Sequence, residues 1–162
     1  METYYVYDSE SDELVGKYEV MLADDPAKQN ESKGTATVSY LTLSASKYYT
    51  SDLCFTLIVH AYVYTSGSFR QINSITNDHN VTMSSTSYVP FEWYGQQSHY
   101  VGSSTGNYPT TSLDYSFSGT LRTTATVSYN ATIQYLVNMG FSGTQNSYYY
   151  LSYDSVGQIS LY

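Results

Sequence analysis

Between positions 53 and 65, in the most apolar stretch of the chain, uniformly apolar positions alternate with mixed ones. One set of alternate positions is entirely apolar: Leu53, Phe55, Leu57, Val59, Ala61 and Val63. The set between them is mixed: Cys54, Thr56, Ile58, His60, Tyr62 and Tyr64. A period of two with many β-branched and aromatic residues predicts one long strand with a single buried face. We expect this strand to form the centre of the hydrophobic core.

Other segments with strand-like composition are shorter, and they cover residues 3–7, 14–22, 35–44, 69–76, 148–153 and 156–162. Within 35–44 the apolar positions change parity near Tyr40, which predicts a β-bulge there, followed by a turn at 46–51. Pro90 makes 88–94 an edge strand or an irregular one, since proline cannot donate to a sheet ladder. Residues 81–83 are too few for an assignment.

The cleanest amphipathic pattern lies at 124–137, where Ile133 and Val137 belong to the apolar set and Leu136 to the opposite set. This alternation predicts a strand with one face on the core and one in water. Residues 95–112 are rich in Gly, Ser, Gln and Asn and show no alternation. We predict a long loop there, and long loops in compact domains are often functional.

These patterns give roughly eight to ten strands separated by Gly, Ser and Asn turns, with no helix of ordinary length. The expected fold is therefore an all-β antiparallel sandwich, with a closed β-barrel as the alternative. No linker or repeat interrupts the chain, so we predict one domain over residues 1–162.

Composition supports this fold and limits the partners. The chain has 21 Tyr and 44 Ser and Thr residues, whereas charged residues make up only 12%. Ordinary globular chains have roughly 25% charged residues, so hydroxyls and amides must cover much of this surface. The net charge of −8 disfavours binding to nucleic acid or anionic membranes. No stretch approaches the length of a membrane-spanning helix, and no membrane insertion is expected.

The single cysteine, Cys54, cannot form a disulfide within the chain. No apolar segment follows Met1, and we expect a secreted or cell-surface protein from which a signal peptide has been removed. In composition the whole chain resembles the Tyr-, Ser- and Thr-rich β-sandwich modules of secreted Gram-positive bacterial proteins. This resemblance transfers no functional residue.

A candidate ligand site surrounds the only tryptophan. Its members are aromatic, amide and carboxylate side chains: Glu92, Trp93, Tyr94, Gln96, Tyr100, Asn107 and Tyr108. Sugar rings stack on aromatic faces, while amides and carboxylates bond to their hydroxyls, so this set suits a carbohydrate-binding module that uses Trp93 and the 95–112 loop. The alternative is that Trp93 packs in the core.

The sequence gives weaker support for metal binding and for catalysis. The acidic segment 8–13 offers oxygens to calcium but lacks the spacing of an EF-hand loop, and a solvated turn explains it better. The histidines His60, His79 and His99 lack zinc-ligand spacing, although His79 and His99 could converge in space. Cys54 and His60 share a face but lie roughly 20 Å apart along a strand, too far for proton transfer.

We therefore expect a non-catalytic extracellular module with a structural or interaction role, without cofactor or metal, whose partner is a glycan or protein at a cell surface. Carbohydrate binding is the alternative. A hydrolase centred on Glu92, whose aromatic neighbours could raise its pKa, and a pore-forming toxin that inserts 124–137 are further alternatives.

Overall fold

The computed structural model describes residues 2–7, 14–22, 32–33, 36–124, 130–143 and 148–161, with side chains for 37–93, 99–123, 132–143 and 148–161. The acidic segment 8–13 lies outside these residues. In the part of the chain that is described, no helix is both long and apolar enough to cross a membrane.

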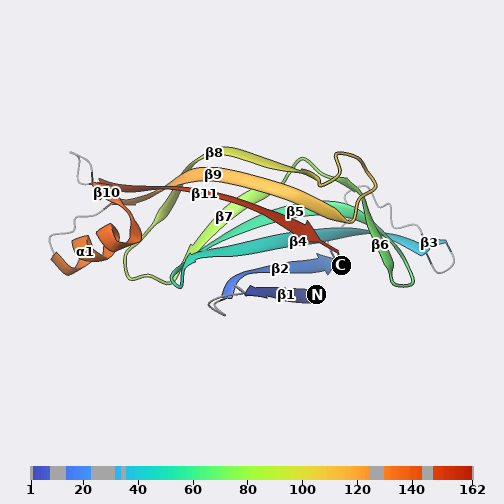
Figure 1. Cartoon of the computed structure of the whole chain (residues 1–162), viewed down its shortest axis with the longest axis horizontal. Helices are drawn as coiled ribbons and strands as arrows, with labels where there is room; N and C mark the ends of the chain where they lie inside the picture. Colours follow the sequence, from blue (N-terminus) through green and yellow to red (C-terminus); the bar gives the residue numbers. More distant parts are fainter. Residues whose placement is uncertain are drawn as a thin grey trace.

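Two antiparallel sheets pack face to face and form an all-β sandwich, as predicted (Figure 1). The larger sheet has the order β1-β2-β4-β5-β6, with β3 paired to β4 and β7 paired to β5. Its strands are β1 (Glu2–Tyr7), β2 (Leu14–Leu22), β3 (Ser32–Lys33), β4 (Ala36–Thr50), β5 (Leu53–Ser66), β6 (Phe69–Ile75) and β7 (Asn80–Ser85).

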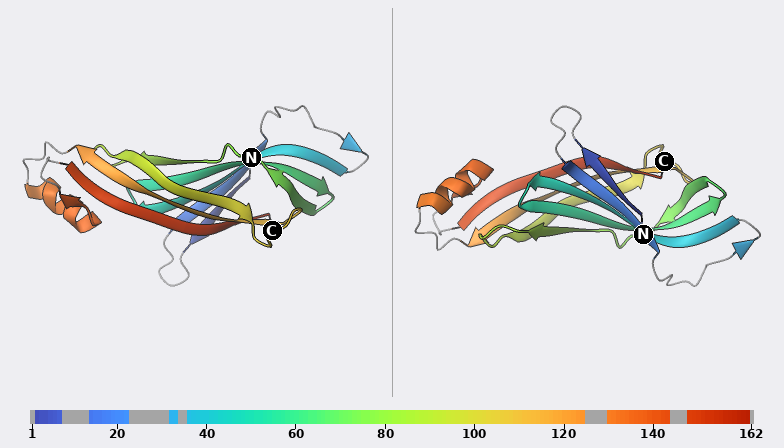
Figure 2. Two further views of the ribbon diagram at one scale, coloured as in Figure 1. Left: turned by 90° about the horizontal axis from the view of Figure 1, so that it is seen from above. Right: turned by 90° about the horizontal axis from the view of Figure 1, so that it is seen from below.

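The smaller sheet has the order β10-β11-β9-β8. Its strands are β8 (Glu92–Ser103), β9 (Ser112–Thr124), β10 (Ser142–Gly143) and β11 (Tyr148–Ser160). The one helix of the described chain, α1 (Asn130–Met139), lies at one end of the molecule (Figure 2). The two sheets stay separate among the described residues, so the fold is not the closed barrel of the alternative.

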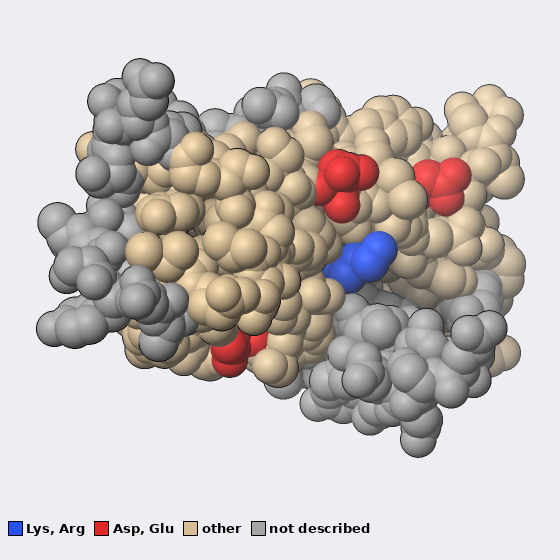
Figure 3. Space-filling model, turned by 60° about the vertical axis from the view of Figure 1, so that its left-hand side comes forward, with Lys and Arg blue, Asp and Glu red and all other residues tan. Residues whose placement is uncertain are grey.

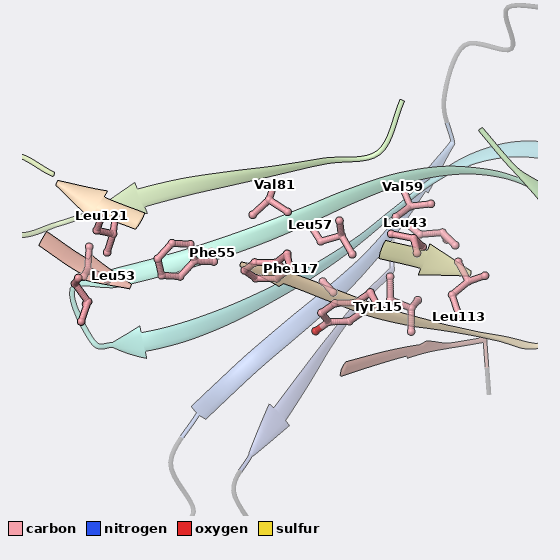
Figure 4. Close-up of a cluster of buried hydrophobic side chains, with 14 of the residues drawn as sticks. Leu43, Leu53, Phe55, Leu57, Val59, Val81, Leu113, Tyr115, Phe117 and Leu121 are labelled. Atoms are coloured by element: carbon pink, nitrogen blue, oxygen red, sulfur yellow. The ribbon is translucent and has the colours of Figure 1, made fainter. Parts of the chain in front are cut away.

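The segment 53–65 is the central strand, as its alternation predicts. In β5, positions 53–63 alternate between buried and half-buried without a break. β4 pairs along one edge of β5, and β6 and β7 share the other edge. Phe55 and Leu57 face Phe117 and Tyr115 of β9 across the space between the sheets (Figure 4). Burial of this face removes apolar surface from water and drives the packing of the two sheets.

β4 is longer and more regular than predicted. Its register with β5 is unbroken from Ala36 to Tyr48, so the bulge near Tyr40 and the long turn at 46–51 are both wrong. The change of apolar parity has another cause: residues on both faces of β4 are buried. Leu43 points into the core, whereas Tyr40 on the other face stacks on His60, with ring centroids 5.6 Å apart.

The predicted strand at 124–137 is also wrong. β9 ends at Thr124, and α1 occupies Asn130–Met139. Leu136 and Met139, three residues apart, are buried, as expected for one face of a helix. Gly140, with φ +97°, ends the helix: its N–H donates to the Val137 carbonyl, and the N–H of Phe141 donates to the Leu136 carbonyl. This pair of bonds is a Schellman motif.

The predicted loop at 95–112 is shorter than expected, because β8 continues to Ser103. The strand keeps its pairing with β9 despite register shifts between Tyr94 and Ser98. Only residues 104–111 connect β8 to β9, at the end of the sheet opposite α1 (Figure 1). Pro90 precedes β8, which is an edge strand.

Candidate functional site

Trp93 lies between the sheets. Its ring meets Phe55 edge-to-face, with centroids 4.9 Å apart, and covers the backbone of Gly119 on β9. The indole Nε1 is buried without a hydrogen-bond partner among the described residues. Trp93 is half-buried, and its ring packs against the core rather than standing free on the surface.

Glu92 points to the opposite face of β8, toward solvent. Its carboxylate accepts two hydrogen bonds from Arg122, with Nη2···Oε2 at 2.7 Å and Nε···Oε2 at 3.2 Å. The Arg122 guanidinium also lies 5.2 Å from the centre of the Tyr148 ring. Glu92 is therefore part of an ion pair on the outer surface of the small sheet. The side chains of Tyr94 and Gln96 lie outside the described residues.

The remaining predicted residues gather at the far end of β8. Tyr100 is 56% exposed and Tyr108, in the 104–111 loop, is 41% exposed. Seven residues separate Trp93 from Tyr100, or roughly 20 Å along a strand. The predicted set thus divides into a half-buried residue packed against the core at one end and two surface tyrosines at the other.

Tyr100 lies flat along its own strand. A side chain at position 102 would collide with the Tyr100 hydroxyl and ring, so glycine at this position allows the ring to lie over the sheet. Burial raises the pKa of Tyr108, a hydrogen bond from the Ser103 backbone lowers it, and the neighbouring Tyr100 raises it.

The loop that presents Tyr108 is held by its own hydrogen bonds. The Ser103 hydroxyl donates to the Asn107 carbonyl at 2.6 Å, and the N–H of Gly106 donates to the Ser103 carbonyl at 3.1 Å. Thr110 exchanges two backbone hydrogen bonds with Ile72 of β6, at 2.6 and 3.0 Å. This loop is fastened to both sheets, and a binding surface held in place loses little freedom on binding.

Three polar side chains lie beside the tyrosines. Asp114 of β9 accepts hydrogen bonds at Oδ1 from the Ser104 hydroxyl at 2.8 Å and from the Gln158 amide at 3.1 Å. The Gln158 amide also lies 3.2 Å from Ser104 Oγ. Cross-strand pairing puts Gly102, Asp114 and Gln158 in one row. Tyr100, whose ring covers Gly102, therefore borders this polar group.

We call this surface the tyrosine platform, defined by Tyr100, Ser104, Tyr108, Asp114 and Gln158. Its two tyrosines are among the residues predicted from the sequence, whereas the three polar residues are not. Asp114 and Gln158 are distant in sequence, and only the register of β9 with β11 brings them together. Asn107 is exposed in the same loop, and its carbonyl serves the loop's internal bonds.

The structure does bring His79 and His99 together, with ring centroids 4.6 Å apart and planes at 83°. Burial lowers the pKa of His79, His99 lowers it further, and Asp78 opposes the shift. No group of three or more metal-ligating side chains forms within the described residues. His60 bonds instead to Thr42, at 3.0 Å.

Cys54 borders a shallow hollow of about 280 Å³ on the outer face of the large sheet. The hollow is lined mainly by hydroxyl groups: Ser46, Tyr48, Ser51, Asp52, Cys54, Thr56, Ser84 and Thr86. Asp52 is already engaged there, since it accepts hydrogen bonds from Tyr135 at 3.1 Å and Thr86 at 3.4 Å. This polar, open hollow has no charged group free to orient a ligand among its described residues.

Comparisons of the chain with protein-family models, curated proteins and solved structures give no match. Any assignment of function therefore depends on the geometry described above.

Proposed function

We propose that this chain is a non-catalytic β-sandwich module of a secreted or cell-surface protein, and that it binds carbohydrate through the tyrosine platform. One observation supports the binding role above others. The exposed Tyr100 covers Gly102, which pairs with Asp114 in a hydrogen-bonded Ser104–Asp114–Gln158 group, and the exposed Tyr108 lies in the same loop as Ser104. Aromatic faces pack against the C–H groups of a sugar ring, and carboxylate and amide groups bond to its hydroxyls.

The surroundings of the platform suit such a ligand. The outer face of β9 carries Ser112, Ser116, Ser118 and Thr120, and β11 adds Ser152 and Ser160. Figure 3 brings the α1 end of the molecule forward, and few charged side chains are visible there among the described residues. Hydroxyl groups bind a sugar little more strongly than water does. Stacking on tyrosine would therefore contribute much of the affinity.

Trp93 has no part in this proposal, because its ring packs against Phe55 and Gly119. Glu92 has none either, since Arg122 holds its carboxylate. The binding proposal therefore moves from the tryptophan to the opposite end of β8.

A glycan array tests the proposal. We expect wild-type protein to bind at least one saccharide, and Tyr100→Ala or Tyr108→Ala to weaken that binding by about 2–10-fold each through lost stacking. Tyr88→Ala is the matched control, because Tyr88 is 71% exposed at a distant site. Absence of any bound glycan, or equal losses in all three variants, would contradict the proposal.

A further inference from the structure

We infer that the tyrosine platform selects glycans that carry free amino groups or are neutral, and rejects glycans that carry carboxylate, sulfate or phosphate groups. Asp114 sets this preference. The inference depends on the proposed carbohydrate binding and adds the chemical class of the ligand.

Hydrogen bonds orient the Asp114 carboxylate. Both hydrogen bonds that reach its carboxylate from the described residues end on Oδ1, from Ser104 and Gln158. Asp114 is exposed, and no described donor bonds to its Oδ2. One oxygen therefore fixes the side chain, while the other is open to an O–H or N–H group of a ligand. An ammonium group would form a charge-assisted bond there.

The aromatic neighbours of Asp114 also favour cations over anions. The face of a tyrosine ring carries the negative part of its quadrupole, which attracts cations and repels anions. Tyr100 lies over Gly102, which pairs with Asp114 across the strands. The ring and the carboxylate thus favour the same sign of charge in a bound ligand.

Three cations have described side chains, and none of them belongs to the platform. Arg122 pairs with Glu92 at the far end of β8, and Lys47 bonds to the Val156 carbonyl on β11 at 3.3 Å. A third cation, Arg70, lies on β6, two residues from the bridge between Ile72 and Thr110. A second exposed carboxylate, Asp154, lies on the outer face that includes Asp114. With a net charge of −8, the chain as a whole also repels polyanions.

The experiment compares the affinities of three charge classes of glycan at low and high salt. Chitohexaose, its fully deacetylated hexamer and a hexagalacturonate serve as neutral, amino and anionic probes in a calorimetric titration. We expect the amino hexamer to bind about 2–5-fold more tightly than the neutral one at low salt, and the anionic probe to bind least. High salt should reduce the difference between the amino and neutral hexamers.

Asp114→Asn should abolish the preference for the amino hexamer, because asparagine keeps an acceptor for Ser104 and Gln158 but removes the charge. Asp154→Asn removes the same charge from the same face without touching the platform, and it should keep the preference. Arg70→Gln should leave the order of the probes unchanged. Circular dichroism and thermal unfolding verify that each variant is folded.

Two results would overturn the inference while leaving the proposed function intact. One is an anionic glycan among the tightest ligands, with affinity that still depends on Tyr100 and Tyr108. The other is an unchanged order of the probes in Asp114→Asn. If no glycan of any class binds to wild-type protein, the proposed function fails, and this inference fails with it.

Discussion

At the scale of single residues, aromatic rings cover glycines on the inner face of the small sheet. The Trp93 ring lies where a side chain at Gly119 would project, and the Tyr115 ring lies likewise over Gly157. A glycine in a strand leaves a gap in the sheet surface, and an aromatic ring from a neighbouring strand fills it. The ring positions therefore depend on the absence of Cβ atoms at 119 and 157.

Gly119→Ala should lower the free energy of unfolding by about 1–3 kcal/mol, because the new methyl group would collide with the packed indole of Trp93. Urea unfolding measures this change. Gly102→Ala is the matched control: its methyl group would meet Tyr100, but that ring is 56% exposed and can turn away. We expect this control to lose less stability and to weaken carbohydrate binding. Equal destabilisation by both variants would contradict this account.

Tyr115 makes stability depend on pH in alkaline solution. Burial raises the pKa of its phenol above the value in an unfolded chain, about 10. A group with a raised pKa in the folded state contributes its full stability below the unfolded pKa, and that contribution falls as the pH rises toward the folded pKa. The free energy of unfolding should therefore decrease above about pH 10. In urea titrations, Tyr115→Phe should reduce this decrease and Tyr88→Phe should not.

At the scale of elements, the sequence predicts a strand well where only one face is buried. β5 is the best example, because its apolar and mixed positions alternate without exception from Leu53 to Tyr64. Alternation of apolar positions predicts β4 poorly, because Tyr40 is buried on one face and Leu43 on the other. The first half of β8 carries no alternation, yet it pairs with β9 through backbone groups, whose hydrogen bonds do not depend on side-chain pattern.

The helix α1 was missed although its end carries a sequence signal. Gly140 occupies the position where a left-handed residue ends a helix, and the apolar Phe141 follows it. Phe141 and Leu136 are both buried, as the Schellman motif favours. The strand prediction over 124–137 was based on alternation alone and did not include Gly140.

Leu136 and Val137 distinguish the helix from the predicted strand. The strand pattern places Val137 in the core, whereas in the structure Leu136 is 0% exposed and Val137 is 53% exposed. Leu136→Ala should therefore lower the free energy of unfolding by about 2–5 kcal/mol. Val137→Ala should change it by about 0.5 kcal/mol or less, as for other surface positions. The reverse order in urea unfolding would favour the strand.

At the scale of the whole molecule, the two sheets carry different kinds of residue on their inner and outer faces. Their inner faces share one core, which includes Phe55, Leu57, Leu113, Phe117 and Leu121. The outer face of the small sheet carries hydroxyls, amides and the tyrosine platform. Composition predicted such a polar, weakly charged surface, but the sequence could not locate the platform, because three strands and one loop supply its residues.

The sole tryptophan now provides a reporter remote from the platform. Its Nε1 is buried near Gly119, whereas Tyr108 and Asn107 lie in the loop at the opposite end of β8. A ligand on the tyrosine platform should leave the indole undisturbed. A ligand bound around Trp93 should change the environment of the indole before that of the platform residues.

A titration of ¹⁵N-labelled protein with the tightest ligand from the glycan array, followed by NMR, tests the central claim most directly. We predict that the largest shift changes occur at the amides of Gly102, Gly106, Asn107 and Tyr108 and at the Gln158 side chain, with the Trp93 indole signal unchanged. Shift changes centred on the Trp93 indole, or spread evenly over both sheets, would contradict carbohydrate binding by the tyrosine platform.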